Sequence, residues 1–263
     1  MPKKRSPRIK SKKTTAGTQA ADDLLSLPFD HFERHALTRH IADIVRESTE
    51  RETLRVLDVG GGPASLSRFL TKDYVVTADP EDTEARTTQA GIETFLHADG
   101  TRLPFADGAF DLVVSHDTLE HVPANLRTPF VEELLRVAAD ATVINGPFAT
   151  QDVDSAEALV TDIARETMGE GHATVRYLSE HAEHGLPDLP QTISEIEAAG
   201  FAPLVVPNGA LNEWVSKMLV KHHSQRLALH GVKAQDLDRW SNAVYRPVAE
   251  PEPTYRHAVI VSK

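Results

Sequence analysis

A glycine-rich turn in the sequence RVLDVGGGPAS, residues 55–65, has the composition expected where a strand ends and a ligand approaches the backbone. A dinucleotide-binding turn follows the pattern G-x-G-x-x-G, but Ser65 occupies the third glycine position. A P-loop needs a lysine and then a serine or threonine after its last glycine, and proline and alanine stand there instead. Asp58 precedes Gly60 by two residues, where its carboxylate attracts a cationic group such as an α-amino group and repels a pyrophosphate. The turn therefore predicts a ligand that is positively charged at this end.

Two further acidic residues follow the next two predicted strands. Asp79 ends the apolar run in YVVTADPED and lies 21 residues after Asp58, a position from which a carboxylate accepts hydrogen bonds from both hydroxyls of a ribose. Asp99 follows the third strand and can accept a hydrogen bond from an adenine amino group. An amine, a ribose and an adenine together describe S-adenosylmethionine better than they describe a dinucleotide.

With these motifs the chain resembles the class I S-adenosylmethionine-dependent methyltransferases, in the branch that carries LPF-x-D-x-x-FD-x-V, over roughly residues 54–146. The resemblance implies that the first aspartate and the glycines line the methionyl part of the cofactor, that the second aspartate holds the ribose and that the third holds the adenine. It also implies that His116, just past the fourth strand, touches the cofactor near the reacting centre. The cofactor-binding residues implied in this way are Asp58, Gly60, Gly61, Gly62, Asp79, Asp99, Gly100 and His116.

One departure from the family pattern lies in the turn itself. The usual D-x-G-x-G-x-G becomes DVGGGPA, with Pro63 and Ala64 at the end of the motif. Alanine is small enough for close packing, and proline suits the first turn of a helix. The altered turn is therefore still compatible with cofactor binding.

Methyl transfer from a sulfonium is an in-line displacement. It depends more on the alignment of the nucleophile with the methyl group than on a strong catalytic acid, so we do not expect a catalytic motif that is easily recognised in the sequence. His121 in DTLEHV could act as a general base, although the family resemblance favours a packing role for a histidine at this position. The stretch GHATVRYLSEHAEHGLPD adds His172 and His181, which can act as a base, contact the substrate or form an ordinary polar surface. His181 and His184 do not form an H-E-x-x-H motif and have no evident third ligand, so no metal is expected. The predicted catalytic residues are His121, His172 and His181.

The acceptor is predicted only by class. The segment LSEHAEHGLPD resembles part of the lids of bacterial methyltransferases associated with surface-glycan biosynthesis. This favours transfer to oxygen or nitrogen of a glycan-type or other small-molecule acceptor. Two alternatives stay open: a methyltransferase-like module that binds the cofactor without catalysis, and a nicotinamide-dependent oxidoreductase, which Ser65 and Asp58 disfavour.

The elements that must position these residues alternate between short apolar runs and helical patterns. This alternation predicts an α/β fold with a doubly wound, mostly parallel sheet and helical insertions, and the family resemblance implies that this is the Rossmann-like methyltransferase fold. Strands are predicted at 54–59, 74–78, 92–97, 110–115, 141–145, 201–206 and in the final RHAVIVSK, and helices at 32–45, 64–72, 82–90, 124–138 and before Gly200. The long connections 147–189 and 208–254 are predicted to be lid insertions over the ligand.

Composition limits the remaining possibilities. Apolar residues make up 40% of the 263-residue chain, enough for a sizeable core, and no apolar run approaches the length of a membrane span. Residues 1–19 predict a disordered basic tail, with the methyltransferase domain over 20–263. Outside the seven basic residues of that tail, 39 acidic residues oppose 21 basic ones, so nucleic acid is an unlikely partner. The absence of cysteine fits a cytoplasmic protein, and the oligomeric state is left open.

Overall fold

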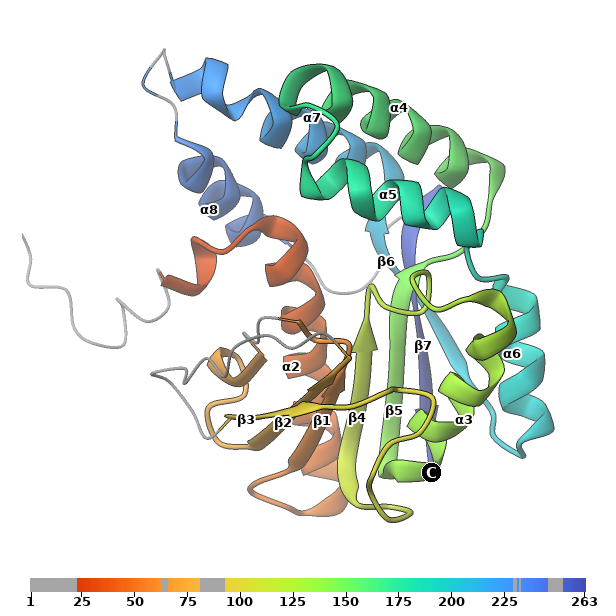
Figure 1. Cartoon of the computed structure of the whole chain (residues 1–263). Coiled ribbons are helices and arrows are strands. Elements are labelled where there is room, and N and C mark those ends of the chain that lie inside the picture. The colour runs from red at the N-terminus through yellow and green to blue at the C-terminus, as the bar shows by residue number, and fades with distance from the viewer. Residues whose placement is uncertain (1–22, 63–65, 81–92, 229–230, 232, 246–252) are drawn as a thin grey trace, which may run out of the picture.

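The computed structural model describes residues 23–62, 66–80, 93–228, 231, 233–245 and 253–263. Its centre is one seven-stranded sheet in the order β3-β2-β1-β4-β5-β7-β6 (Figure 1). The strands are β1 (Arg55–Val59), β2 (Tyr74–Asp79), β3 (Glu93–His97), β4 (Phe110–His116), β5 (Ala138–Pro147), β6 (Leu204–Ala210) and β7 (Thr254–Ser262). The first five strands pair in parallel, whereas β7 is antiparallel to both β5 and β6. The prediction of a doubly wound, mostly parallel sheet is confirmed.

The central strands are buried on both faces, which explains their continuous apolar sequences. All seven residues of β4, FDLVVSH, are buried, and β1 is buried from Val56 to Val59. Strands with helices on both sides cannot show the polar alternation of a half-exposed strand. β5 begins at Ala138, three residues before the predicted start, because α3 runs directly into it.

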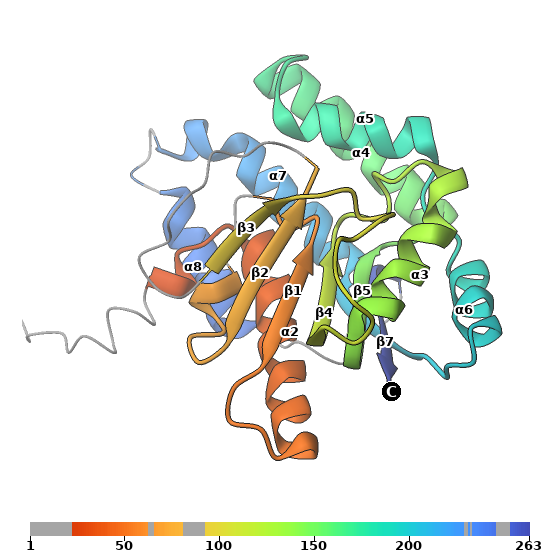
Figure 2. The ribbon, with the colours of Figure 1, turned by 60° about the horizontal axis from the view of Figure 1, so that its bottom comes forward.

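Helices cover both faces of the sheet, as Figure 2 shows. Helix α2 (Phe29–Thr49) packs on one face, where Leu37, Ile41 and Val45 join a core cluster with residues of β1 and β4. Helix α3 (Arg127–Val137) and helix α6 (Leu189–Ala198) lie on the opposite face and contribute to a second core cluster. Gly200, with a φ of 91°, follows the end of α6 as the sequence predicted.

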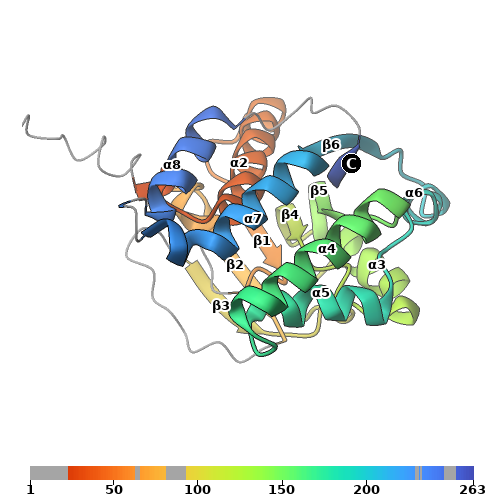
Figure 3. The same cartoon turned by 90° about the horizontal axis from the view of Figure 1, so that it is seen from above.

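The two long insertions form a third layer over the ends of the parallel strands. The first contains α4 (Gln151–Met168) and α5 (Ala173–His184), and the second contains α7 (Leu211–Ala228) and α8 (Ala234–Val244). Seen from above in Figure 3, α4 lies between α5 and α7. Val153 and Val160 of α4, Leu178 of α5 and Trp214 of α7 bury their side chains in a common cluster. The apolar side chains Leu211, Trp214 and Met218 of α7 are therefore packed inside the protein.

Other expectations are met differently or fall outside the described residues. Where a helix was predicted at 64–72, the described part contains only a short 3₁₀ segment, η1 (Leu66–Arg68); a second such segment, η2 (Ala124–Leu126), precedes α3. The predicted helix 82–90 and the predicted tail 1–19 lie outside the described residues. Within those residues, every helix is too short or too polar to cross a bilayer.

Candidate functional site

The glycine turn after β1 is built so that side chains would not fit. Gly60 has a φ of 78°, and a Cβ atom there would lie 2.3 Å from Thr118 Cγ2. A Cβ on Gly61 would lie 2.4 Å from Asp58 Oδ2. Gly62 has a φ of 56°, another conformation that favours glycine. The turn therefore presents bare backbone at the carboxyl end of β1, as the sequence predicted.

Asp79 binds this turn from the neighbouring strand. Its side chain lies at the end of β2, and Oδ2 accepts a hydrogen bond from the backbone N–H of Gly62 at 3.0 Å. Asp58 is 1% exposed and pairs in register with Thr77 of β2 and Val114 of β4. The residues predicted to hold the methionyl group and the ribose thus meet at one edge of the sheet.

Asp99 and Gly100 follow the end of β3 on the same edge. Asp99 is exposed, and its Oδ1 accepts hydrogen bonds from the N–H of Thr101 at 2.9 Å and the hydroxyl of Thr101 at 2.8 Å. These bonds lower the pKa of Asp99. A Cβ atom on Gly100 would lie 2.3 Å from Phe130 Cε2, so glycine allows α3 to pack closely here. The backbone N–H of Ala98 donates to the carbonyl of Asp79 at 3.1 Å, which fixes the loop beside the turn.

His116 ends β4 and is almost fully enclosed. Its Nε2 lies 2.6 Å from Thr38 Oγ1, and its Nδ1 lies 3.3 Å from Asn145 Nδ2. Burial, with the charge of Arg34 as a second cause, lowers the pKa of His116 to about 3, so the ring is neutral. An amide nitrogen can only donate, so Nδ1 is the acceptor and Nε2 donates to Thr38. Both ring nitrogens therefore have protein partners, and contact with a cofactor stays a prediction.

His121 and His181 come together across 60 positions of sequence. Their Nε2 atoms lie 3.3 Å apart, with ring centroids at 4.7 Å. His121 Nδ1 lies 3.0 Å from Glu180 Oε2, and His181 Nδ1 lies 3.1 Å from both carboxylate oxygens of Glu157. Each imidazole is thus oriented by a carboxylate behind it. The structure brings these two of the predicted catalytic histidines into one cluster.

The carboxylates around this pair come from several elements. Tyr255 of β7 donates its hydroxyl to Glu157 Oε1 at 2.9 Å, and it stacks on Trp214 of α7. Glu120 is 1% exposed, and a carboxylate oxygen of Glu120 lies within 4.8 Å of a ring nitrogen of both His121 and His181. The sequence analysis missed Glu120, Glu157 and Tyr255 as site residues. Only Glu120 carried a signal, since it directly precedes His121.

Burial and neighbouring charges shift the pKa values in this cluster in different directions. Burial, reinforced by the charge of Asp117, raises the pKa of Glu120 to about 8. Burial and then the proximity of His181 lower the pKa of His121. Burial alone would also lower the pKa of His181, but the hydrogen bond and charge of Glu157 outweigh it and the net shift is upward. Glu120 therefore changes its protonation state near neutral pH, and pKa values perturbed by burial and by specific charged neighbours are typical of functional sites.

His172 does not belong to this cluster. It caps the N-terminus of α5, where Nδ1 accepts a hydrogen bond from the N–H of Thr174 at 3.2 Å, and its ring packs edge-on against His222. Nine residues separate it from His181, about 13 Å along the helix at 1.5 Å per residue. Of the three predicted catalytic histidines, the structure therefore leaves His172 apart.

The loop after β4 connects the histidine cluster to the glycine turn. Thr118 Oγ1 lies 3.5 Å from the carbonyl oxygens of Val59 and Gly60, and the carbonyl of Thr118 accepts a hydrogen bond from the N–H of His121 at 2.9 Å. The predicted cofactor half and the histidine cluster thus lie at the same edge of the sheet. This is the edge where ligands bind in open α/β sheets.

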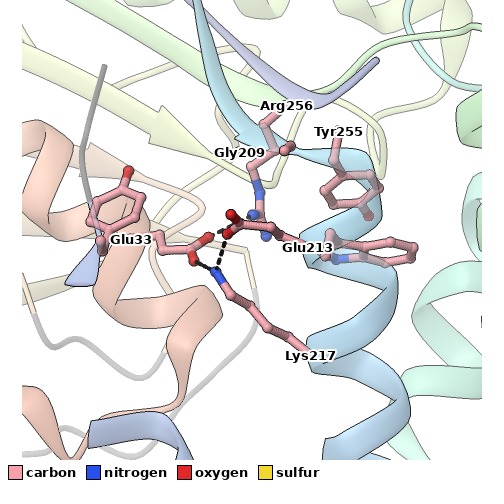
Figure 4. A pocket seen from close by; sticks show the side chains of 9 residues that line it. Glu33, Gly209, Glu213, Lys217, Tyr255 and Arg256 are labelled. Carbon is pink, nitrogen blue, oxygen red and sulfur yellow. Dashed lines mark hydrogen bonds and ion pairs between the residues drawn. The ribbon is translucent and has the colours of Figure 1, made fainter. Parts of the chain in front are cut away.

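Two pockets lie between α2 and α7. Figure 4 shows a small one, about 10 Å³, where Glu33 of α2 and Lys217 of α7 form an ion pair at 2.5 Å and Arg256 of β7 approaches Glu33 to 3.7 Å. A larger one of about 380 Å³ lies among α2, α7 and α8, with Phe29 and Trp240 in its wall. None of the predicted cofactor-binding residues lines either of these two pockets.

Comparison with known proteins identifies the family. Residues 57–144 match the family model described as a methyltransferase domain. An uncharacterized methyltransferase of Mycolicibacterium gilvum is 32% identical over 186 residues, which cover 65% of this chain and 69% of that protein. The chloroplastic tocopherol O-methyltransferase of Arabidopsis thaliana is 34% identical over 109 residues, covering 37% of this chain and 31% of that enzyme.

Solved structures agree on the fold. The plantazolicin methyltransferase BpumL in complex with SAH superposes with a TM-score of 0.54 at 11% identity, over 94% of this chain and 91% of that one. The magnesium protoporphyrin IX methyltransferase of Synechocystis with bound SAH gives 0.50 at 11% identity, over 96% and 90%. The chain therefore belongs to the class I S-adenosylmethionine-dependent methyltransferases and is an enzyme that takes its methyl group from S-adenosylmethionine.

Proposed function

We propose that the enzyme methylates oxygen or nitrogen of a small-molecule or glycan-type acceptor, which the pair His121 and His181 binds and activates. The observation that carries the proposal is the position of this pair. Its Nε2 atoms face one another at 3.3 Å, carboxylates orient both rings, and the loop of His121 contacts the glycine turn. A hydroxyl or amine held here would lie next to the cofactor and within reach of a group that can take its proton.

The cofactor half of the proposal assigns one role to each group of residues at the sheet edge. Asp58 and the glycines 60–62 receive the methionyl part, Asp79 the ribose, and Asp99 with Gly100 the adenine. His116 borders the reacting centre. Support comes from the hydrogen bond between Asp79 and the turn, and from the shared edge on which these strand ends lie.

The lid half of the proposal concerns acceptor choice. The insertion 147–189 supplies α4 and α5, and with them Glu157, Glu180 and His181. The relationship to a tocopherol O-methyltransferase supports oxygen as the methylated atom. His172 stays a candidate for acceptor contact from the far end of α5.

The experiment is to compare cofactor affinity with turnover in two single variants. With a panel of hydroxyl-bearing and amine-bearing acceptors, production of S-adenosylhomocysteine from S-adenosylmethionine is measured for the wild type, His121→Gln and His181→Gln. Turnover should fall by roughly 10²- to 10⁴-fold, the usual contribution of a proton-transferring group. Affinity for S-adenosylhomocysteine, measured by calorimetry, should not change.

His184→Gln provides the matched control, because His184 lies one turn further along α5. It takes part neither in the contact between His121 and His181 nor in that between His172 and His222. It should keep full turnover. Full turnover in both cluster variants would remove His121 and His181 from the chemistry. A loss of cofactor affinity in proportion to turnover would place them in the cofactor site instead.

A further inference from the structure

The hydrogen bonds of His121 and His181, when both rings are neutral, place two unprotonated Nε2 atoms next to one another, and their lone pairs repel. An ionised carboxylate accepts hydrogen bonds and cannot donate them, so the Nδ1–H of each neutral ring donates, to Glu180 in one case and Glu157 in the other. A neutral imidazole has a single N–H, so each ring then presents an unprotonated Nε2. These two nitrogens face one another at 3.3 Å. Two lone pairs at this distance repel unless a proton on one ring or a metal ion lies between them.

Glu120 adds a buried oxygen at the same place. Its Oε2 is fully enclosed and has no hydrogen-bond partner among the described residues. The side chain is 1% exposed, so bulk solvent does not reach it. A Cβ atom on Gly146 would approach this oxygen to 3.0 Å, so glycine in β5 leaves room for the carboxylate.

We propose that Glu120, His121 and His181 bind a divalent transition-metal ion, with Glu157 and Glu180 as the carboxylates that orient the two imidazoles. One ligand atom from each of the three residues lies within 4.8 Å of the others. Two ligand nitrogens, each about 2.0 to 2.1 Å from a zinc ion at the tetrahedral angle, lie about 3.3 Å apart. A metal-bound histidine usually donates its other N–H to a carboxylate or carbonyl, which is the arrangement of both rings here.

The donor set indicates the class of metal. Two imidazoles and one carboxylate suit Zn²⁺, Co²⁺ or Fe²⁺, whereas Mg²⁺ and Ca²⁺ prefer oxygen ligands alone. Three protein ligands leave at least one coordination position open, as in catalytic zinc sites. This departs from the sequence-based expectation of no metal, which lacked the third ligand. His184, the partner considered there, is not part of the site.

The ion gives a definite role to the cluster, and this role rests on the proposed function. An Nε2 atom that binds a cation cannot also accept a proton, so with the ion bound the pair would act on the acceptor as metal ligands and not as the proton acceptor proposed above. The open position of the ion would then hold the acceptor oxygen beside the cofactor, in place of a hydrogen bond to the imidazole. Binding of the metal itself is testable without acceptor or cofactor, so a failed acceptor assignment and a failed metal site give different results.

The experiment uses the full chain after chelator treatment and dialysis. Titration with Co²⁺, followed by its visible d–d absorption, should show one site per chain with a low-coordinate spectrum, and Zn²⁺ should displace the Co²⁺. Calorimetry should detect Zn²⁺ but not Mg²⁺. The double variant His121→Gln/His181→Gln should lose at least 100-fold in Zn²⁺ affinity. Glu157→Gln, which changes only an orienting carboxylate, should lose about 10- to 100-fold.

Two single variants serve as controls for the metal titration. His172→Gln and His184→Gln remove histidines from the same helix region and should keep wild-type affinity, with folding of every variant checked by circular dichroism. The proposal is overturned if the wild type shows no d–d band, since that result needs no variant to fold. It is also overturned if the double variant binds Zn²⁺ as tightly as the wild type. A bound metal without any methyl transfer to hydroxyl or amine acceptors would refute the acceptor assignment alone.

Discussion

Arg256 of β7 donates through Nε to Asp117 Oδ1 at 2.6 Å, in the loop that leads from β4 to the histidine cluster. The arginine side chain is only 5% exposed. Asp117 has a φ of 46°, a left-handed conformation that aspartate tolerates better than most residues. Arg34 of α2 approaches the same carboxylate to 3.5 Å, so two arginines hold this strained residue from two elements.

Removal of Arg256 should therefore be costly. Arg256→Met removes the buried cation that lies between Asp117 and Glu33 and leaves Arg34 and Lys217 as their remaining partners, a loss of up to about 3 to 5 kcal/mol in the free energy of unfolding. Urea denaturation followed by circular dichroism measures it. Arg165→Met is the control, because Arg165 is 40% exposed and pairs with Asp162 and Glu170 on the surface; it should cost about 1 kcal/mol or less. Similar losses in the two variants would contradict the buried-pair argument.

Asp79 is predicted to contribute to the affinity for the cofactor. Asp79→Ala removes the acceptor proposed for the ribose hydroxyls as well as the bond to Gly62, so affinity for S-adenosylhomocysteine should fall at least about tenfold, from a loss of about 1.5 to 3 kcal/mol. Calorimetry on the folded variant tests this. Asp107→Ala serves as the comparison, since Asp107 is 83% exposed in the turn before β4. Unchanged affinity in Asp79→Ala would refute the ribose assignment.

The two positive-φ glycines of the turn offer a matched pair. Gly62→Ala introduces only backbone strain, about 1 to 2 kcal/mol, because nothing described lies within 4 Å of the added Cβ. Gly60→Ala adds a clash with Thr118 and should lose about 1 to 3 kcal/mol more. The free energies of unfolding of both variants check this order. If Gly60→Ala were no less stable than Gly62→Ala, the close approach of Thr118 would be wrong.

The neutral, buried His116 predicts a specific loss of stability in acid. In the unfolded chain a histidine titrates near about 6.5, whereas the folded pKa of His116 is about 3. Its contribution is complete above pH 6.5 and is lost as pH falls, because the unfolded chain takes up a proton that the folded chain does not. His116→Gln removes this term, so the stability gap between variant and wild type should shrink by about 2 kcal/mol from pH 7 to pH 5. If the free energies of unfolding of the wild type and His116→Gln, measured by urea denaturation, changed with pH in the same way, the neutral state assigned to the buried His116 would be wrong.

The sequence predicted most of what lies inside the parallel half of the sheet. Strands such as β1 and β4 carry continuous apolar residues because helices cover both faces, and this pattern is local. The turn glycines are also readable locally, since Gly60 and Gly61 have no room for a side chain and Gly62 has a positive φ. The predicted helix at 64–72 failed because apolar spacing over so few residues does not distinguish an α-helix from the short 3₁₀ segment at Leu66–Arg68.

The histidine cluster was only half predictable, for a physical reason. His121 and His181 could be named as chemically suitable, but their contact depends on how α5 packs over the loop after β4. Glu157 reaches His181 from α4, and Tyr255 reaches Glu157 across 98 positions of sequence. No local pattern encodes such a contact, so the carboxylates behind the rings and the third ligand emerged only from the structure.

The position of β7 between β5 and β6 makes the contacts of Tyr255 and Arg256 depend on strand pairing between distant parts of the sequence. β6 pairs with β7 in the described sheet, and β7 also pairs with β5, more than a hundred residues earlier in the chain. Until β7 inserts, β6 has no place in the sheet, and neither Tyr255 nor Arg256 reaches its carboxylate. Non-local pairing of this kind slows folding, because a long loop must close before its contacts are gained. We therefore expect the glycine turn between β1 and β2, whose pairing is more local, to form before the contacts of Tyr255 and Arg256.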